Sequence, residues 1–290
     1  MEFGFLIDRR RVVINNIEIK PLNNFEETIN RFYQSATVSN GWVYPPLVNT
    51  NRNFTEKKRF KVEGKIASIF FLFEPTHSIT IYPFDEDKVK FLILAFGFLN
   101  GLYLSPAGYL YLNRVPYKIG KITGVILIRN DAEKGILTFS KCFDRMSTEK
   151  RKLAFSILHW FLIGPSYLYD WDRFDAQYKV LDGIYKFSGL SAPNHASRPI
   201  ELSKKYGIEI PKWAQLNSDG KTSKLSIIRN DLVHEAKYAG QPIGCEYPKE
   251  NFNLEFVRFN TKLIAAVFGL KSNFLQSDPM DRNTHGWAFA

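Results

Sequence analysis

The sequence predicts an α+β protein, with a β-rich mixed region over residues 1–145 followed by an all-α helical bundle over residues 146–290. Short β-branched and aromatic runs separated by turn residues fill much of the first region. Beyond Met146 the apolar residues recur at helical spacing, and only helices are predicted. At 290 residues, 45% of them hydrophobic, the chain is long enough for two medium domains with a sizeable core.

In the first region, residues 11–14 and 17–19 predict a β-hairpin whose turn is the Asn15-Asn16 pair. Residues 41–53 are rich in proline and asparagine and predict a long loop. Further strands are expected at 60–64, 66–73, 78–82, 109–112, 124–128 and 136–139. Strands therefore account for most of the predicted structure before residue 145.

The predicted helices are marked by the residues at their ends. A helix is expected over 85–103, because acidic residues starting at Asp85 crowd the first turn, where the helix dipole favours negative charge. A turn over 130–135 separates two of the predicted strands. In the second region, helices are expected at 147–163, 172–187, 200–206, 223–238 and 251–269.

The formal charge of +10 is spread over both regions and leaves two interpretations open, a polyanionic partner or plain solubility. Cys142 and Cys245 lie far apart, without the spacing of a disulfide framework or a zinc site, so a reducing, cytoplasmic compartment and no bound metal or cofactor are expected. The longest apolar run, 91–104, is too short for a membrane span of about 20 residues. We expect no membrane association.

The helix predicted over 223–238 carries an unusual set of polar residues. On a helical wheel its core stripe consists of Leu225, Ile228, Leu232 and Ala236. Arg229 lies at the edge of this stripe, whereas Asn230 and His234 share a face opposite to it, with Ile227 beside them. The arginine and the histidine differ by about 140°, a gap that the long arginine stem can bridge. Two interpretations remain open: a solvent-facing histidine among surface charges, or a face covered by a second surface such as another subunit.

The stretch from Arg229 to His234, RNDLVH, resembles the signature of HEPN domains (higher eukaryotes and prokaryotes nucleotide-binding). That signature is an arginine, commonly followed by a polar residue, and a histidine after four intervening residues. The context is similar as well, because the motif lies late in a helical region and one long helix follows it. Residues 240–244 are similar to loops of bacterial members. A near-copy at Arg129 lacks the histidine and does not count, so the resemblance covers residues 147–290 only.

The resemblance implies a metal-independent RNA endonuclease that acts as a homodimer, with the two motif helices facing each other across a cleft. His234 would then serve in acid–base catalysis, because an imidazole titrates near neutral pH. Arg229 would stabilise charge on the scissile phosphate, and Asn230 would orient the imidazole or bind phosphate. The family also implies a toxin or phage-defence effector, whose trigger or inhibitor the sequence does not identify. The region 1–145 would sense the trigger or restrain the nuclease.

Two other function classes stay open. Some HEPN domains only bind nucleotides or RNA and build dimers, so the chain is alternatively a non-catalytic binding and dimerisation module. A third hypothesis is a regulatory partner protein whose first region binds a ligand. Expression toxicity that depends on His234 distinguishes catalysis from binding.

Several further residues are candidates for lining the cleft, and for each a structural role is the competing interpretation. They are Asp231, Asp172, Arg173 and His285. Three other histidines are assigned no function: His159 to the core or an interface, His77 to a turn, and His195 to an exposed loop. Basic residues at 9–11 and 57–59, with Trp42 and Tyr44, are typical of nucleic-acid binding, but a charged strand edge explains them as well.

Overall fold

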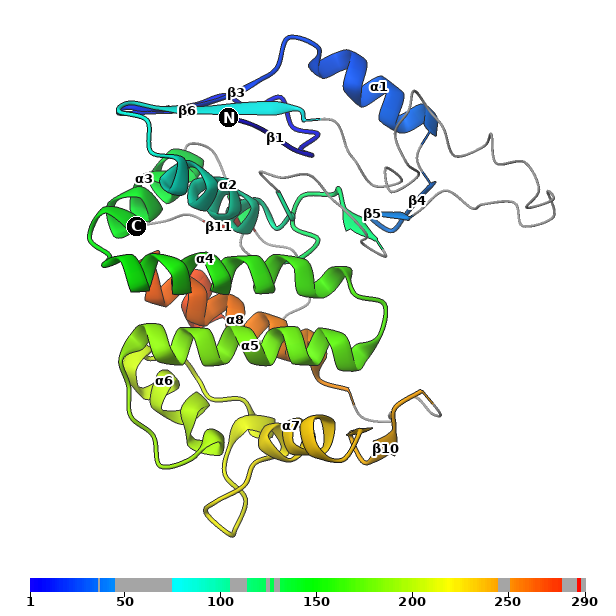
Figure 1. Cartoon of the computed structure of the whole chain (residues 1–290), viewed down its shortest axis with the longest axis vertical. Coiled ribbons are helices and arrows are strands. Elements are labelled where there is room, and N and C mark those ends of the chain that lie inside the picture. The colour runs from blue at the N-terminus through cyan, green and yellow to red at the C-terminus, as the bar shows by residue number, and fades with distance from the viewer. Residues whose placement is uncertain are drawn as a thin grey trace, which may run out of the picture.

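The computed structural model describes residues 1–35, 37–44, 75–104, 114–123, 126–127, 131–244, 251–277 and 286–287. Its elements form a stack of layers (Figure 1), with a small sheet at one end and the helices α6 (Arg198–Tyr206) and α7 (Lys224–His234) at the other. The α+β class that the sequence predicts is confirmed. Among the described residues, no helix is long and apolar enough to cross a membrane.

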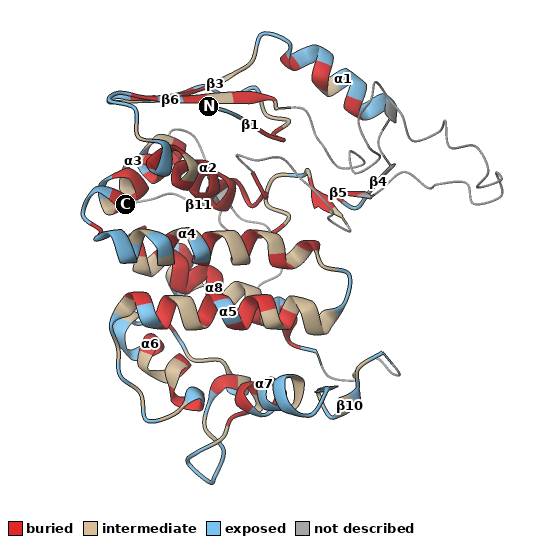
Figure 2. Ribbon diagram, viewed as in Figure 1, coloured by how far each residue is buried: buried red, intermediate tan, exposed pale blue. Residues whose placement is uncertain are grey.

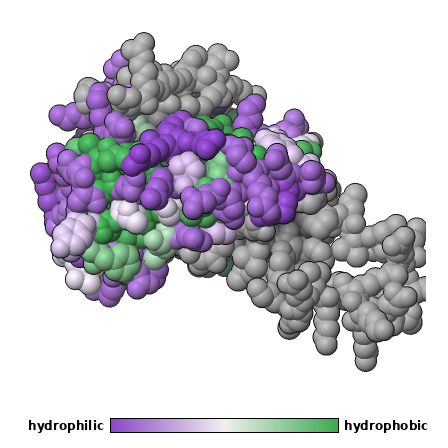
Figure 3. Space-filling view, turned by 90° about the horizontal axis from the view of Figure 1, so that it is seen from above, coloured by the Kyte–Doolittle hydropathy of each residue, from purple (hydrophilic) through white to green (hydrophobic). Residues whose placement is uncertain are grey.

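The terminal layer is an antiparallel sheet in the order β1-β6-β3-β2. Its strands are β1 (Glu2–Phe3), β6 (His77–Ile81), β3 (Ile17–Pro21) and β2 (Val12–Ile14). The predicted hairpin is confirmed, and Asn15 in its turn takes a φ of 50°, which asparagine tolerates better than most residues. Ile19 and Ile79 are fully buried on the inner face. Figure 3 views the molecule from the sheet end and shows hydrophilic residues across the described surface, with apolar residues between them.

Helix α2 (Glu86–Asn100) packs beneath the sheet and confirms the helix predicted there. Asp85 caps its start by accepting a hydrogen bond of 3.0 Å from the Lys88 backbone N–H. The helix is buried on nearly all sides, so even Lys88 is only 7% exposed. Its ammonium group binds both carboxylate oxygens of Asp144, at 2.7 and 2.8 Å, and so connects α2 with the end of the next helix.

The turn predicted over 130–135 and the strand over 136–139 are wrong, because α3 (Asp131–Asp144) spans both. Gly135 was the misleading signal, since it reads as a turn residue in isolation. The apolar residues Ile136, Phe139 and Phe143 recur at helical spacing, and all three are buried. Acidic groups in the first turn suit the helix dipole.

The region before residue 145 is also less rich in strands than predicted. Helix α1 (Phe25–Ser35) lies where only strands and loops were expected, although Glu26 and Glu27 occupy its first turn. The remaining strands here are short: β4 (Thr37–Ser39), β5 (Trp42–Tyr44), β7 (Val115–Pro116) and β8 (Ile126–Leu127), which pairs with β11 (Gly286–Trp287). Strand β5 replaces the start of the predicted 41–53 loop. The described part of this region is therefore mixed, with three helices.

The five helices predicted after residue 146 are present. They are α4 (Thr148–Ile163), α5 (Asp170–Ser188), α6, α7 and α8 (Asn253–Val267), with short 3-10 turns η3 (Gly164–Ser166), η4 (His195–Ser197), η5 (Lys212–Ala214) and η6 (Asn273–Gln276). Helix α5 packs against α4, α6, α7 and α8 and is the centre of this half. A hairpin of β9 (Lys237–Tyr238) and β10 (Gln241–Pro242) interrupts the all-α pattern that was predicted.

The predicted domain boundary at residue 145 falls in the turn between α3 and α4, and the apolar core crosses it. Phe98 of α2 contacts Phe161 of α4 at 5.5 Å between ring centroids. Phe268, just beyond α8, contacts Phe91 at 6.0 Å and Phe139 at 5.1 Å. Figure 2 shows buried residues concentrated where the layers meet. The two predicted regions therefore share one core.

Some predictions fall outside the described residues. These are the strands at 60–64, 66–73 and 109–112, the basic group at 57–59, Cys245 and His285.

Candidate functional site

The candidate site is built on helix α7, whose start is fixed by a reciprocal cap. Ser223 accepts a hydrogen bond of 3.1 Å from the Ser226 backbone N–H, and Ser226 accepts one of 2.8 Å from the Ser223 backbone N–H. Leu225 and Ile228 are 1% and 4% exposed, so they anchor the helix to the core as the helical wheel predicts. The cap and these two side chains determine which face of α7 is exposed to solvent.

The three residues predicted to be catalytic lie together on that outer face. The Arg229 Nη1 atom lies 3.3 Å from His234 Nε2 and donates a hydrogen bond of 3.1 Å to Asn230 Oδ1. Because arginine only donates, Nε2 acts as the acceptor and the imidazole proton resides on Nδ1 in this arrangement. The arginine stem thus bridges the angular gap between positions 229 and 234. The helical wheel allows this contact, and the structure contains it.

The exposure of these groups matches their orientation on the wheel. His234 and Asn230 are exposed, whereas Arg229 is half-buried, with its guanidinium 5.9 Å from the centroid of the Tyr178 ring on α5. Ile227 is 44% exposed and Val233 is 53% exposed. Within the described chain, no carboxylate lies at ion-pair distance from Arg229. An exposed imidazole, a positioned guanidinium and two aliphatic side chains therefore share one surface.

Helix α7 ends at His234, four residues earlier than predicted. Ala236, assigned above to the core stripe, is exposed and has a φ of 50°, a left-handed conformation that ends the helix. The chain then enters the β9–β10 hairpin, and Tyr238 is drawn inward to 3% exposure. Its hydroxyl donates to Asn253 Oδ1 at 3.2 Å. The burial of Tyr238 is a tertiary effect that helical spacing does not reveal.

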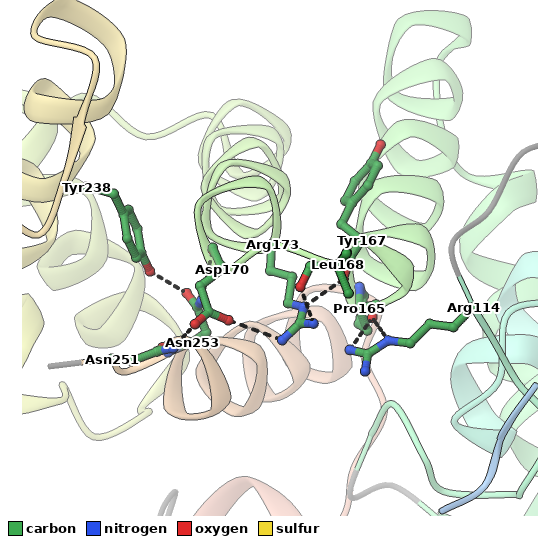
Figure 4. A network of polar contacts seen from close by, with 9 residues as sticks. All are labelled: Arg114, Pro165, Tyr167, Leu168, Asp170, Arg173, Tyr238, Asn251 and Asn253. Carbon is green, nitrogen blue, oxygen red and sulfur yellow. Dashed lines mark hydrogen bonds and ion pairs between the residues drawn. The ribbon is translucent and has the colours of Figure 1, made fainter. Parts of the chain in front are cut away.

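Figure 4 shows how this hairpin is held in place. The Asn253 side-chain amide donates to the Asp170 backbone carbonyl at 2.9 Å, and the Asp170 carboxylate accepts from Asn251 at 2.7 Å. Arg173 binds the same carboxylate at 3.1 Å and the backbone carbonyl of Tyr167 at 2.8 Å. The position of His234 therefore depends on contacts with the starts of α5 and α8.

The residues proposed to line the cleft occupy different places. Arg173 belongs to the network of Figure 4 and holds the loop before α5. Asp172 lies on another face of α5 with Asp175 and Lys179, and burial together with the Asp175 carboxylate raises the pKa of Asp172. Asp231 is half-buried on α7 itself. The motif residues are thus brought together, while Arg173 is engaged by other partners and Asp172 lies on another face of α5.

Sequence reasoning missed a basic group beside the motif. Tyr178, Asp182 and Tyr185 recur on one face of α5, with Arg229 over the first ring and Arg198 over the last, 5.0 Å from its centroid. Arg198 also binds Asp182 at 2.6 Å. The two guanidiniums therefore follow one another along the same helix face. Neither spacing nor composition pointed to Arg198, since it joins the site through the packing of α6 on α5.

His195, assigned above to an exposed loop without a role, also lies beside α7, because η4 packs against that helix. Burial lowers the pKa of His195, and the guanidiniums of Arg198 and Arg229 lower it further. Burial raises the pKa of Tyr178 to about 12, so this phenol stays protonated at neutral pH. The site therefore combines two imidazoles and two guanidiniums, groups whose chemistry suits phosphate binding and proton transfer.

Other titratable groups are placed away from this site. His77 is fully buried in β6, not in a turn as predicted, and burial lowers its pKa to about 4. His159 is half-buried, packs among aromatic rings of α4 and Tyr103, and burial lowers its pKa. Burial raises the pKa of the Cys142 thiol. In the described part of the chain, no group of three or more histidine, cysteine, aspartate and glutamate residues is arranged to hold a metal ion.

Comparison of the chain with protein-family models, with curated proteins and with solved structures found no match.

Proposed function

We propose that the chain is a metal-independent RNA endonuclease that acts as a homodimer, with α7 of each protomer lining a shared cleft. The observation that carries the proposal is the 3.3 Å contact between Arg229 Nη1 and His234 Nε2 on an exposed helix face. These are the two residues of the signature that RNDLVH resembles, and they adopt a geometry suited to joint action on one phosphate.

The chemistry follows from the two functional groups. RNA cleavage without a metal requires removal of the ribose 2′-hydroxyl proton, attack of that oxygen on phosphorus and protonation of the departing 5′-oxygen. His234 provides an imidazole for proton transfer near neutral pH. Arg229 presents a guanidinium to the non-bridging oxygens, where negative charge builds up. Asn230 accepts from the same guanidinium and so fixes its direction.

A second copy of the chain completes this site. A two-fold interface is isologous, so α7 would meet α7 and bring two imidazoles together, one to act as base and the other as acid. The exposed aliphatic side chains of Ile227 and Val233 flank His234 and would be covered in such a dimer. His195 and Arg198, the latter paired with Asp182, continue the polar surface along α5, where the RNA backbone would pass.

The test is cleavage of RNA by purified protein in the presence of EDTA. His234→Ala should lower the rate by about 10²–10⁴-fold, the usual range for loss of a general acid or base. Arg229→Ala should abolish cleavage with little loss of stability, because it lies at the edge of the core, and Asn230→Ala should weaken it less. Lys152→Ala, which removes an exposed cation paired with Glu149, serves as a control and should cleave normally.

The outcomes separate the proposed enzyme from a binding module. If wild-type protein and His234→Ala bind RNA equally and neither cleaves it, the chain is a non-catalytic RNA-binding and dimerisation module. Loss of cleavage on chelation would contradict the metal-independent mechanism. A cytoplasmic toxin or phage-defence role is part of the proposal through the family resemblance, and it predicts that expression slows growth only when His234 is intact.

A further inference from the structure

A second basic cluster lies far along the chain from α7, around Trp42 of β5. The guanidinium carbon of Arg114 is 4.1 Å from the centroid of the indole ring, and the Lys121 ammonium is 5.7 Å from the same centroid. Lys118, three residues before Lys121, lies beside the start of this strand, since its backbone N–H donates at 3.4 Å to the carbonyl of Gly41, the residue before β5. Trp42 is 7% exposed, Arg114 and Lys121 are half-buried, and Lys118 is exposed, so the cluster extends from a buried ring to the surface.

The cluster is held in place by contacts with two other parts of the chain. Arg114 donates two hydrogen bonds to the Pro165 carbonyl, from Nη2 at 2.9 Å and from Nε at 3.2 Å, as Figure 4 shows. The turn that carries the two lysines is fixed to the end of α2, because Gly120 N donates to the Asn100 carbonyl at 2.7 Å. These contacts orient Arg114 through one edge of its guanidinium and leave the Nη1 hydrogens for another acceptor.

The close approach of the lysines depends on the glycine beneath them. A Cβ atom on Gly41 would lie 2.8 Å from Lys118 Cβ and 3.3 Å from Lys121 Cδ, and Gly41 has a φ of 78°. The turn between β4 and β5 therefore has no side chain at the point where the two lysine stems pass it. The two lysine stems therefore run past the same glycine, and the Lys121 ammonium lies over Trp42.

The charges in this cluster are not neutralised by the described part of the chain. No carboxylate there lies at ion-pair distance from Arg114, Lys118 or Lys121. Burial lowers the pKa of Lys121, and the charges of Arg114 and Lys118 lower it further, which shows that the three cations act on one another. Like charges held together in this way favour a multiply charged anion.

We propose that Arg114, Lys118 and Lys121 form a phosphate-binding site over Trp42. Phosphate suits the cluster better than a carboxylate, because its oxygens accept from a guanidinium fork and from two ammonium groups at once. The phosphate belongs to a small phosphorylated ligand or to a nucleic-acid backbone, which share this chemistry. This site is independent of the proposed nuclease, because it uses none of the residues on α7.

The experiment measures binding of inorganic phosphate and of a short single-stranded DNA by calorimetric titration of the full chain. DNA lacks the 2′-hydroxyl, so the proposed cleavage cannot occur during the titration. The double variant Lys118→Gln/Lys121→Gln should weaken binding by at least about tenfold, since each lost charge-assisted hydrogen bond is worth that much or more. The control is Lys152→Gln/Lys204→Gln, which removes the same charge from exposed lysines paired with Glu149 and Glu201.

The two ligands distinguish the two sources of phosphate. Saturable binding of inorganic phosphate that the double variant loses supports a small-ligand site, whereas loss confined to the DNA supports a backbone site. Equal binding of both ligands by the double variant and the control would overturn the proposal, as would absence of binding by wild-type protein. Thermal unfolding of both variants shows whether they are folded. If the double variant is unfolded, a second measurement on the wild-type chain tests the proposal. Bound phosphate should protect Lys121 from acetylation.

Discussion

His77 should make the stability of the fold depend on pH below neutrality. Its side chain is fully buried in β6, where the ring lies between Phe3 and Phe25, and Nδ1 is 3.0 Å from the Thr76 hydroxyl. Burial lowers its pKa from 6.5 to about 4, against smaller opposing effects of the Asp8 carboxylate and of nearby backbone groups. The folded state therefore prefers the neutral ring.

The sign and size of this pH effect follow from the difference between the pKa of His77 in the folded state and in the unfolded state. Above a pH of about 6.5 the ring is neutral in both states and contributes nothing. As the pH falls from 6.5 towards 4, the unfolded chain binds a proton that the folded chain does not, so the free energy of unfolding decreases. The full difference between the two pKa values corresponds to about 3 kcal/mol of unfolding free energy, and about 2.5 kcal/mol of it is lost by about pH 4.5. Below a pH of about 4 this contribution levels off.

The assay is urea unfolding followed by tryptophan fluorescence at about pH 7.5 and about pH 4.5, for wild-type protein and for His77→Gln. The glutamine does not titrate, so the variant should lose about 2.5 kcal/mol less stability than the wild type between these two conditions. Absolute stabilities will differ because the substitution disturbs packing, but the comparison uses only the change with pH. If both proteins lose the same free energy, His77 is not held neutral in the fold and the reasoning is refuted.

The remaining predictions concern the candidate site. Arg229→Gln should raise the pKa of His195, because a nearby positive charge is removed, and an NMR titration of that imidazole would show no change if the two side chains were not neighbours. Ile227→Glu should shift the chain towards monomers in sedimentation at micromolar concentration, and an unchanged assembly state would exclude α7 as the interface. Tyr238→Phe should lower the free energy of unfolding by about 1–2 kcal/mol, since Asn253 loses its buried donor, and an unaltered urea midpoint would contradict that hydrogen bond.

Most helices could be predicted from the sequence because their ends carry local signals. Asp85 and Ser147 cap α2 and α4, and both caps are present in the structure. Helix α3 was predicted as a turn and a strand because Gly135, which on its own indicates a turn, lies inside it. The burial of Ile136 and Phe139 against α2 outweighs the low helix propensity of that glycine.

The candidate site was predictable only where one helix supplies it. Arg229, Asn230 and His234 belong to α7, so the wheel gives their relative orientation, and the long arginine stem spans the remaining angle. Arg198 and His195 reach the same surface from a separate segment, through the packing of α6 on α5 and of η4 on α7. Such contacts depend on tertiary structure, and no spacing in the chain encodes them. The cations around Trp42 come together for the same reason, across β5 and the turn after β7.

The early end of α7 links the motif to the rest of the fold. Were the helix to continue to residue 238 as predicted, Tyr238 would lie one turn beyond His234 on the same outer face. Instead Ala236 reverses the chain, and the tyrosine is buried against Asn253, at the first turn of α8. His234 is thereby the last helical residue, with its position set by a buried anchor four residues later. The network from Tyr238 through Asn253 to the start of α5 therefore positions the imidazole that the proposed chemistry requires, although none of its members touches the substrate face.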